Sequence, residues 1–248
     1  MAPRSHGFGA SLIKWVALAA LACVLVAALA VLSLRWLDPP TSAFMLHARM
    51  QAQAAHERGY RTRYSWVSLE QISPDAAIAV IASEDQQFPF HAGFDLRSIR
   101  EAVRSNASGK RVRGASTITQ QVAKNLFLWP GQSYLRKAIE AGLTVLIEAA
   151  WPKERILEMY LNVAEFGHGV YGVEAAAQVF FHQPASRLTR SEAALLAAVL
   201  PNPRVLHIER PSAYLRSRQE WILGQMRQLG GPAYLQEIEA NGAPARGR

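Results

Sequence analysis

A long apolar segment lies near the N-terminus. From Trp15 to Leu34 the chain runs for 20 residues in which only Ser33 is polar, which as a helix is long enough to cross about 30 Å of hydrocarbon. A cleaved signal peptide is the alternative, because Ala28-Leu29-Ala30 resembles a cleavage site. The run is longer than the ~7 to 15 apolar residues usual in a signal peptide, so the pattern favours a membrane anchor.

The segment after the anchor, residues 35–63, is predicted to be a juxtamembrane region. It begins with Asp38-Pro39-Pro40 and continues with a polar stretch of helical character. From Tyr60 to Trp66, aromatic residues or Thr alternate with Arg or Ser, and this period of two predicts one short strand. Beyond it the apolar positions recur at helical spacing, so the pattern predicts a mainly α fold.

Start signals place the helices of this second part. Ser73-Pro74-Asp75 begins a helix that carries Glu84 near its end, and Asp95 caps a helix with Leu96, Ile99 and Val103 on one face. Further helices are predicted at Lys153 to Asn162 with Ile156, Leu157 and Tyr160 inward, at 173–181, at 189–200 behind a Thr189/Glu192 capping box, and at 212–229. Residues 241–248, rich in Gly, Ala and Arg, are predicted to be a disordered tail.

Two more helices lie in the middle of the chain. Ser116 is the predicted N-cap of the first, whose buried stripe is Ile118, Val122 and Leu126. Ser133 is the predicted N-cap of the next. Its predicted core-facing side chains are Leu135, Ile139, Leu143 and Leu146.

Composition narrows the class of protein only in part. Half of the 248 residues are hydrophobic, which is enough for a substantial core. The single Cys23 excludes an intramolecular disulfide and a cysteine metal cluster. The net charge of +8 suits nucleic acid, an anionic membrane surface or a phosphorylated substrate. The basic residues that flank the anchor are balanced and do not decide its orientation.

Glu84 is the first candidate catalytic residue. It stands beside Asp85 in a segment that also contains Phe88, Phe90 and His91. Apolar neighbours raise the pKa of a carboxyl group, and the adjacent Asp85 is expected to act in the same direction, which would make Glu84 a base near neutral pH. An ordinary helix end that runs into a loop explains this segment equally well.

Three segments that could bind an anion follow Glu84. Lys110 to Arg113 lie in a glycine-bracketed loop, which is either a solvated surface loop or part of a substrate site. The helix start near Ser116 is suited to bind an anion through its free N–H groups. Arg136 lies four residues before Glu140, and this pair is either a surface ion pair or a cation and a carboxylate turned into a cleft.

Some motif matches carry no function. Gly167 to Gly172 matches the dinucleotide fingerprint, but it follows a helical pattern and not a strand, so it is predicted to be a loop. Ser11 to Lys14 matches the serine and lysine motif of penicillin-binding enzymes without the other elements of that site. The seven histidines show no metal-ligand spacing, and no Ser, His and Asp set is evident.

Four segments, taken in order, resemble the motifs of the peptidoglycan glycosyltransferases. They are Glu84-Asp85-x-x-Phe88-x-x-His91-x-Gly93-x-Asp95, the run GASTITQQ-x-x-Lys124-Asn125, Arg136-Lys137-x-x-Glu140, and Lys153-x-x-Ile156-Leu157-x-x-Tyr160-Leu161-Asn162. The resemblance spans roughly Tyr64 to Pro211. With an anchor and no room for a transpeptidase domain, the chain is similar to the monofunctional biosynthetic members.

The resemblance implies a lysozyme-like glycosyltransferase domain behind a single transmembrane helix, and polymerisation of lipid II into β-1,4-linked glycan with inversion and loss of undecaprenyl pyrophosphate. It implies that Glu84 is the base and that Glu140 positions the cations that neutralise the leaving group. The expected catalytic residues are thus Glu84 and Glu140, and the expected substrate-binding residues are Asp85, Phe88, His91, Ser116, Thr117, Gln120, Gln121, Lys124, Asn125, Arg136 and Lys137. No metal ligand is expected. Gln132 departs from several relatives, which carry a basic residue there.

The expected organisation is a cytoplasmic tail at 1–14, the anchor at 15–34, the juxtamembrane region at 35–63, the glycosyltransferase domain at 64–240 and the tail at 241–248. The catalytic domain is expected on the periplasmic side of the bacterial inner membrane. The expected partners are lipid II, the growing glycan chain, the membrane and cell-wall synthesis proteins, and not nucleic acid. No cofactor is expected to be required, while assistance by Mg²⁺ or Mn²⁺ stays open. The competing functions are a lysozyme-like hydrolase and an inactive membrane-tethered scaffold.

Overall fold

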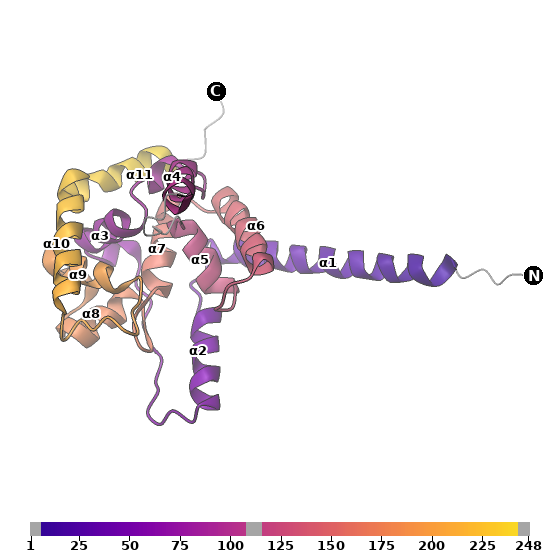
Figure 1. Ribbon diagram of the computed structural model, residues 1–248, viewed down its shortest axis with the longest axis horizontal. Helices are drawn as coiled ribbons and strands as arrows, with labels where there is room; N and C mark the ends of the chain where they lie inside the picture. The colour runs from indigo at the N-terminus through magenta and orange to yellow at the C-terminus, as the bar shows by residue number, and fades with distance from the viewer. Residues whose placement is uncertain (1–5, 108–115, 243–248) are drawn as a thin grey trace, which may run out of the picture. The chain divides into compact units, whose positions relative to one another are not determined.

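A computed structural model of the protein describes residues 6–107 and 116–242 (Figure 1). The described residues form two compact units, divided between Asp38 and Pro39. The first unit consists mainly of α1 (His6–Leu34), in which Lys14–Leu34 is long and apolar enough to cross a membrane. Helix α1 begins at His6, inside the segment predicted as a short tail. From Trp15 to Val26 its apolar side chains are all exposed, as suits a helix surrounded by lipid, whereas Val31 near its end is buried.

The second unit is mainly helical, as the sequence predicted. Its α-helices in chain order are α2 (Ala43–Ala54), α3 (Pro74–Glu84), α4 (Leu96–Ala107), α5 (Ile118–Phe127), α6 (Tyr134–Ala150), α7 (Lys153–Val163), α8 (Val173–Phe181), α9 (Arg190–Val199), α10 (Ala213–Gln228) and α11 (Gln236–Gly242). Short 3-10 turns lie at η1 (Leu69–Gln71), η2 (Phe88–Phe90), η3 (Ala185–Arg187) and η4 (Gly231–Leu235). The bounds of α3, α7, α8, α9 and α10 agree closely with those expected from the start signals and the apolar spacing.

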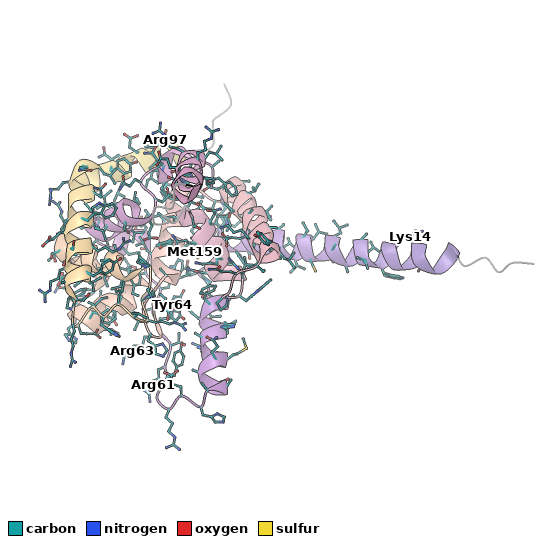
Figure 2. All side chains as sticks on the ribbon, viewed as in Figure 1. Lys14, Arg61, Arg63, Tyr64, Arg97 and Met159 are labelled. Atoms are coloured by element: carbon teal, nitrogen blue, oxygen red, sulfur yellow. The ribbon has the colours of Figure 1, made fainter. Side chains whose placement is uncertain are left out.

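Helix α3 lies in the core of this unit. Every side chain from Ala76 to Ala82 is buried, and the alanines among them let α3 pack closely against α9 and α10, which Figure 1 shows along one edge of the unit. Helix α7 is buried except at Glu154, Arg155 and Glu158, and its Met159, labelled in Figure 2, is fully buried. Because α3 is fixed along its whole length, Glu84 at its end is delivered to a defined position.

A small sheet lies beside the helices and corrects two predictions. It has the order β1-β3-β2, in which β1 (Arg63–Tyr64) pairs parallel to β3 (Val170–Tyr171) and β2 (Glu165–Gly167) pairs antiparallel to β3. The strand predicted over Tyr60 to Trp66 is therefore only two residues long, with Arg63 beside Tyr64 (Figure 2). The region predicted as a loop forms a hairpin and not a loop.

The glycines of this hairpin have packing roles. A Cβ on Gly169 would lie 2.8 Å from the Arg61 carbonyl oxygen, and one on Gly172 would lie 2.7 Å from that of Asn162. Both also have positive φ angles, 73° and 82°, which favour glycine. The match to the dinucleotide fingerprint thus arises from close backbone approach, and the sequence pattern hid the strands because each is so short.

Helix α6 is rotated from its predicted orientation. Ser133 caps it as expected and accepts from the N–H of Arg136, but Leu135 is 68% exposed and Ile139 is 39% exposed. The prediction that these two residues face the core was wrong. The buried face carries Arg136, Glu140, Leu143, Thr144 and Ile147, because the charged pair is satisfied internally and occupies the inner side of the first two turns.

The ends of two other elements also differ from expectation. Thr117, and not Ser116, is the N-cap of α5: its hydroxyl accepts from the Gln120 N–H, while the Gln120 side chain accepts from the Thr117 N–H. Helix α11 continues to Gly242, so the first two residues of the predicted tail are helical. The remainder of that tail, and the basic loop Lys110 to Arg113, lie outside the described residues.

Candidate active site

Glu84 lies at the end of α3 and lines a cleft of about 930 Å³. Two side chains from other elements approach its carboxylate: Gln121 Nε2 donates a hydrogen bond to Oε2 at 3.0 Å, and Arg218 Nη2 lies 3.8 Å from Oε1. The cleft is also lined by Asp95, Arg97, Ser98, Ser116, Thr117, Pro201, Trp221 and Gln225. The Glu84 carboxylate is therefore held between α3, α5 and α10 at the wall of an open cavity.

Burial raises the pKa of Glu84 above its ordinary value of 4.5. The hydrogen bond from Gln121 and the charges of Arg218 and Lys124 act in the opposite direction but do not cancel it. Desolvation penalises the charged form of a carboxyl group, so the Glu84 carboxylate is more basic than one in water. The sequence predicted this direction.

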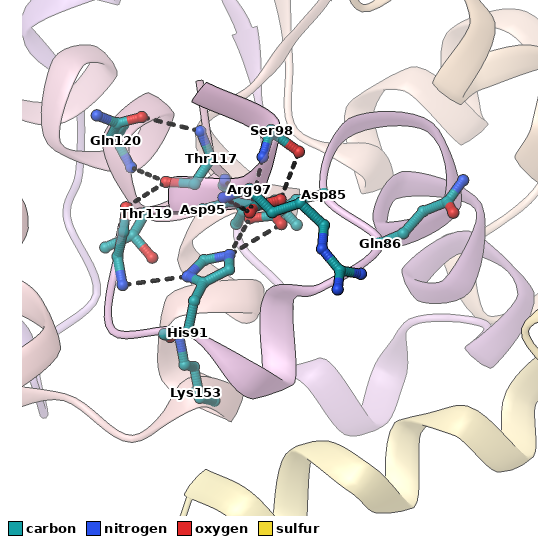
Figure 3. A network of polar contacts seen from close by, with 12 residues as sticks. Asp85, Gln86, His91, Asp95, Arg97, Ser98, Thr117, Thr119, Gln120 and Lys153 are labelled. Atoms are coloured by element: carbon teal, nitrogen blue, oxygen red, sulfur yellow. Dashed lines mark hydrogen bonds and ion pairs between the residues drawn. The ribbon is translucent and has the colours of Figure 1, made fainter. Parts of the chain in front are cut away.

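Asp85 does not act on Glu84 as expected. Its carboxylate contacts His91 Nε2 at 2.9 and 3.0 Å and accepts from the Ile118 N–H at 3.0 Å (Figure 3). It thus neutralises the start of α5 and fixes the loop after α3. The pKa of Glu84 is set by burial, Gln121, Arg218, Lys124 and Ser83 instead.

Several predicted substrate-binding residues take part in internal contacts next to the cleft (Figure 3). Thr117 donates its hydroxyl to the Gly93 carbonyl at 2.7 Å. Lys153 Nζ donates to the His91 carbonyl and to Glu148, and it lies 4.6 Å from the centre of the Phe88 ring. These contacts hold the loop that joins α3 to α4. Asp85, Phe88, His91, Thr117 and Gln120 all belong to this scaffold. Of the predicted substrate-binding residues, Asp85, Ser116, Thr117 and Gln121 line the cleft.

A cluster of cations surrounds Glu140 on α6. Arg136 Nη1 donates to Glu140 at 2.8 Å, and Lys137 Nζ donates to its other oxygen. Arg136 and Glu140 are 8% and 2% exposed, so the alternative of a surface ion pair was wrong. Arg136 Nε is buried and has no hydrogen-bond acceptor among the described residues. Burying an ion pair costs desolvation free energy. A buried pair is therefore weak evidence that the role of these residues is only to stabilise the fold.

Lys124 links the cation cluster to the base. Burial lowers the pKa of Lys124, Glu140 and Glu84 act to raise it, and Arg136 and Lys137 act to lower it. Lys124 is therefore within electrostatic reach of Glu84 as well as of the cluster around Glu140. Gln121 and Lys124 are three residues apart on α5 and share a face, so one helix face holds the base and presents a cation. Asn125, the neighbour of Lys124, is buried.

Sequence reasoning missed the residues that α10 contributes. Arg218, Trp221 and Gln225 line the cleft, although they lie more than 130 positions after Glu84. Their spacing of three and four residues on one helix face was visible. Nothing in the pattern showed that this face would meet the end of α3. Within the described residues, no group of three or more His, Cys, Asp or Glu side chains could hold a metal ion.

Known proteins match this chain over most of its length. The family model for transglycosylases matches residues 51–227, a span that contains Glu84, Lys124, Glu140 and Arg218. The chain belongs to the transglycosylase family. A protein of Xanthomonas campestris pv. campestris (strain B100) called "Biosynthetic peptidoglycan transglycosylase" is 54% identical over 224 residues, 90% of this chain and 91% of the relative.

Proteins with the same name occur in other bacteria. Those of Escherichia coli (strain ATCC 8739) and Shigella boydii serotype 4 (strain Sb227) are each 58% identical over 199 residues, 80% of this chain and 82% of the relative. The mainly α, lysozyme-like class predicted for the transglycosylase unit is confirmed. The family match also begins at residue 51, inside the predicted juxtamembrane region.

Proposed function

We propose that this transglycosylase polymerises lipid II into linear glycan strands for the bacterial cell wall. One observation carries the proposal: Gln121 and Lys124 on one face of α5 join a partly buried carboxylate of raised pKa, Glu84, to a cluster of cations around Glu140. A base and a separate cationic site are what a glycosyl transfer with a pyrophosphate leaving group needs.

In the proposed reaction Glu84 takes the proton from the 4-hydroxyl of the acceptor sugar. The resulting oxygen attacks the anomeric carbon from the face opposite the pyrophosphate, the carbon–oxygen bond to the pyrophosphate breaks, and the configuration inverts. The departing group carries its negative charge away, so it needs neutralisation more than protonation. Lys124, Arg136 and Lys137 are suited to this task, with Arg136 able to offer a forked guanidinium. No cofactor is required in this proposal.

A lysozyme-like hydrolase is the alternative, and the environment of Glu140 argues against it. Glycoside hydrolysis by two carboxyl groups usually needs one of them protonated to donate to the leaving oxygen. Glu140 accepts from Arg136 and Lys137 on its two oxygens, so both oxygens already serve as acceptors for cations. It is better suited to position the cations than to act as a general acid.

Product analysis tests the proposed function. Purified protein in detergent is incubated with labelled lipid II, and the products are separated by length; the proposal predicts a series of glycan chains. A parallel incubation with purified sacculi should release no soluble muropeptides. Muropeptide release without chain formation would favour the hydrolase, and the absence of both activities would favour an inactive scaffold.

We propose that the protein is a single-pass protein of the inner membrane with its catalytic unit on the periplasmic side. Helix α1 supports the anchor by its length and composition. Exposed apolar side chains on α6, among them Leu135, Ile139 and Val145, lie on the helix that carries the cation cluster. Such a face suits a substrate that keeps a long lipid tail in the bilayer.

The partners that we propose for this protein are other cell-wall synthesis proteins.

Removal of residues 1–35 should leave an active enzyme that is soluble or only loosely bound to membranes. The reason is that Glu84, Lys124 and Glu140 all lie in the second unit, which has its own core. Turnover in detergent should be kept, while turnover of lipid II in vesicles should fall. Sedimentation and activity in both media measure this. A native protein whose N-terminus lies near Val31 by mass spectrometry would show a cleaved signal and contradict the anchor.

A further inference from the structure

A chain of hydrogen bonds leads from the core to Glu84. Tyr160 on α7 is 1% exposed, and its hydroxyl donates to Gln121 Oε1 at 3.2 Å. The other end of the same amide, Gln121 Nε2, donates to Glu84 Oε2 at 3.0 Å. Three helices, α7, α5 and α3, each contribute one member of this chain.

The two ends of the chain fix the orientation of the amide between them. An ionised carboxylate can only accept, so the NH₂ group of Gln121 must face Glu84. The amide oxygen then faces Tyr160, whose hydroxyl must donate. Burial raises the pKa of Tyr160 well above its ordinary value of 10.0, so this hydroxyl keeps its proton. A flipped amide would place two acceptors against each other at Glu84, inside the protein, where unsatisfied polar groups are costly.

This arrangement makes the two oxygens of Glu84 unequal. Oε2 is engaged by Gln121, whereas Oε1 has Arg218 Nη2 at 3.8 Å, which is too far for a hydrogen bond. We propose that Tyr160 is a positioning residue that, through Gln121, leaves Glu84 Oε1 as the atom that accepts the proton from the acceptor hydroxyl. The proposal rests on the proposed function for the reaction, but the hydrogen-bond chain itself is independent of it.

The charged and polar groups that face Glu84 come from three elements besides its own. Gln121 and Lys124 belong to α5, Arg218 to α10 and Tyr160 to α7, while Ser83 precedes it on α3. The hydrogen bond from Gln121 lowers the pKa of Glu84 against the effect of burial. Without the Tyr160 hydroxyl the amide loses the bond that orients it, so the pKa of Glu84 should rise further and a larger fraction should be protonated at a given pH.

Tyr160→Phe tests the proposal, because it removes one hydroxyl and keeps the ring. We expect kcat on labelled lipid II to fall about 2- to 10-fold, the size expected from loss of one net hydrogen bond, and the acid limb of kcat/KM to move to higher pH. Tyr171→Phe is the matched control: Tyr171 is 0% exposed, but it lies in the hairpin near Glu165 and Arg204, so its substitution should leave the acid limb in place.

A double substitution separates positioning from a loss of packing. If Tyr160 acts through Gln121, Tyr160→Phe should have little further effect in a Gln121→Ala background. Equal effects in both backgrounds would overturn the proposal, as would an unchanged acid limb in Tyr160→Phe. Infrared spectroscopy can follow the protonation of Glu84 directly, because its carboxyl signal is the one that Glu84→Gln removes. A titration of this signal with and without Tyr160→Phe measures the shift in the pKa of Glu84 without turnover. If the wild-type protein makes no glycan, the proposed function fails while this titration still tests the role of Tyr160.

Discussion

Glu84→Gln is expected to reduce polymerisation of lipid II by ~10²- to 10⁴-fold, the usual effect of removing a general base. Glutamine keeps the size of the side chain and can still bond to Gln121, so the fold should be unchanged. The exposed Glu70→Gln, on the 3-10 turn η1, is the matched control and should be fully active. Parental activity in a folded Glu84→Gln protein would show that another group takes the proton.

The same substitution should make the protein more stable at neutral pH. The pKa of Glu84 is raised above 4.5 by folding, so the folded state binds more protons than the unfolded state and stability falls as pH rises through this range. Glutamine removes that loss. The melting temperature of Glu84→Gln should exceed that of the parent at pH 7, by ~2 to 4 °C for each kcal/mol gained, and the difference should close below pH 4.5. A lower melting temperature at pH 7 would contradict the assignment of a desolvated base.

Lys124→Ala and Arg136→Ala are each expected to lower activity by ~10²- to 10³-fold, as when one group that stabilises developing charge is removed. Both should also weaken binding of a phosphoglycolipid inhibitor such as moenomycin, whose phosphate is expected to occupy the same place. Burial lowers the pKa of Lys124, so its charge is unfavourable in the folded state and alanine should not destabilise the protein electrostatically.

Arg136→Ala needs a companion variant, because it leaves the buried Glu140 with one cation fewer. Lys137→Ala is a suitable companion variant. The Lys137 side chain is 47% exposed, so this protein should fold normally. Arg187→Ala is the control and should bind inhibitor like the parent, because Arg187 is an exposed residue of the turn η3. Gln132→Arg adds a cation just before α6. Any change that this substitution causes in inhibitor binding should be a tightening. Unchanged inhibitor affinity in both Lys124→Ala and Arg136→Ala would move the phosphate site elsewhere.

Local signals predicted most of the helices. A proline in the first turn of α3, Asp95 before α4 and the Thr189/Glu192 capping box before α9 each act within a few residues, and the structure confirms all three. The orientation of α6 could not be predicted in the same way. Its apolar spacing pointed Leu135 and Ile139 inward, but the tertiary environment buries the charged pair Arg136 and Glu140 instead.

The site shows the same division between local and long-range information. Glu84 could be predicted because aromatic and acidic residues lie beside it in the chain. Arg218 could not, since its approach to Glu84 depends on how α10 packs against α3. The role of Asp85 was also beyond sequence reasoning, because its partner is the backbone N–H of Ile118, 33 positions later. The hairpin was missed because strands of two and three residues are too short to show a period of two.

The central claim is that Glu84 is the base of glycan polymerisation. The pH dependence of kcat/KM on lipid II, measured beside infrared titration of the Glu84 carboxyl in the same wild-type protein, tests it most directly. We expect an acid limb whose midpoint lies above pH 4.5 and coincides with the titration of Glu84. A rate that stays constant while Glu84 becomes protonated would contradict it.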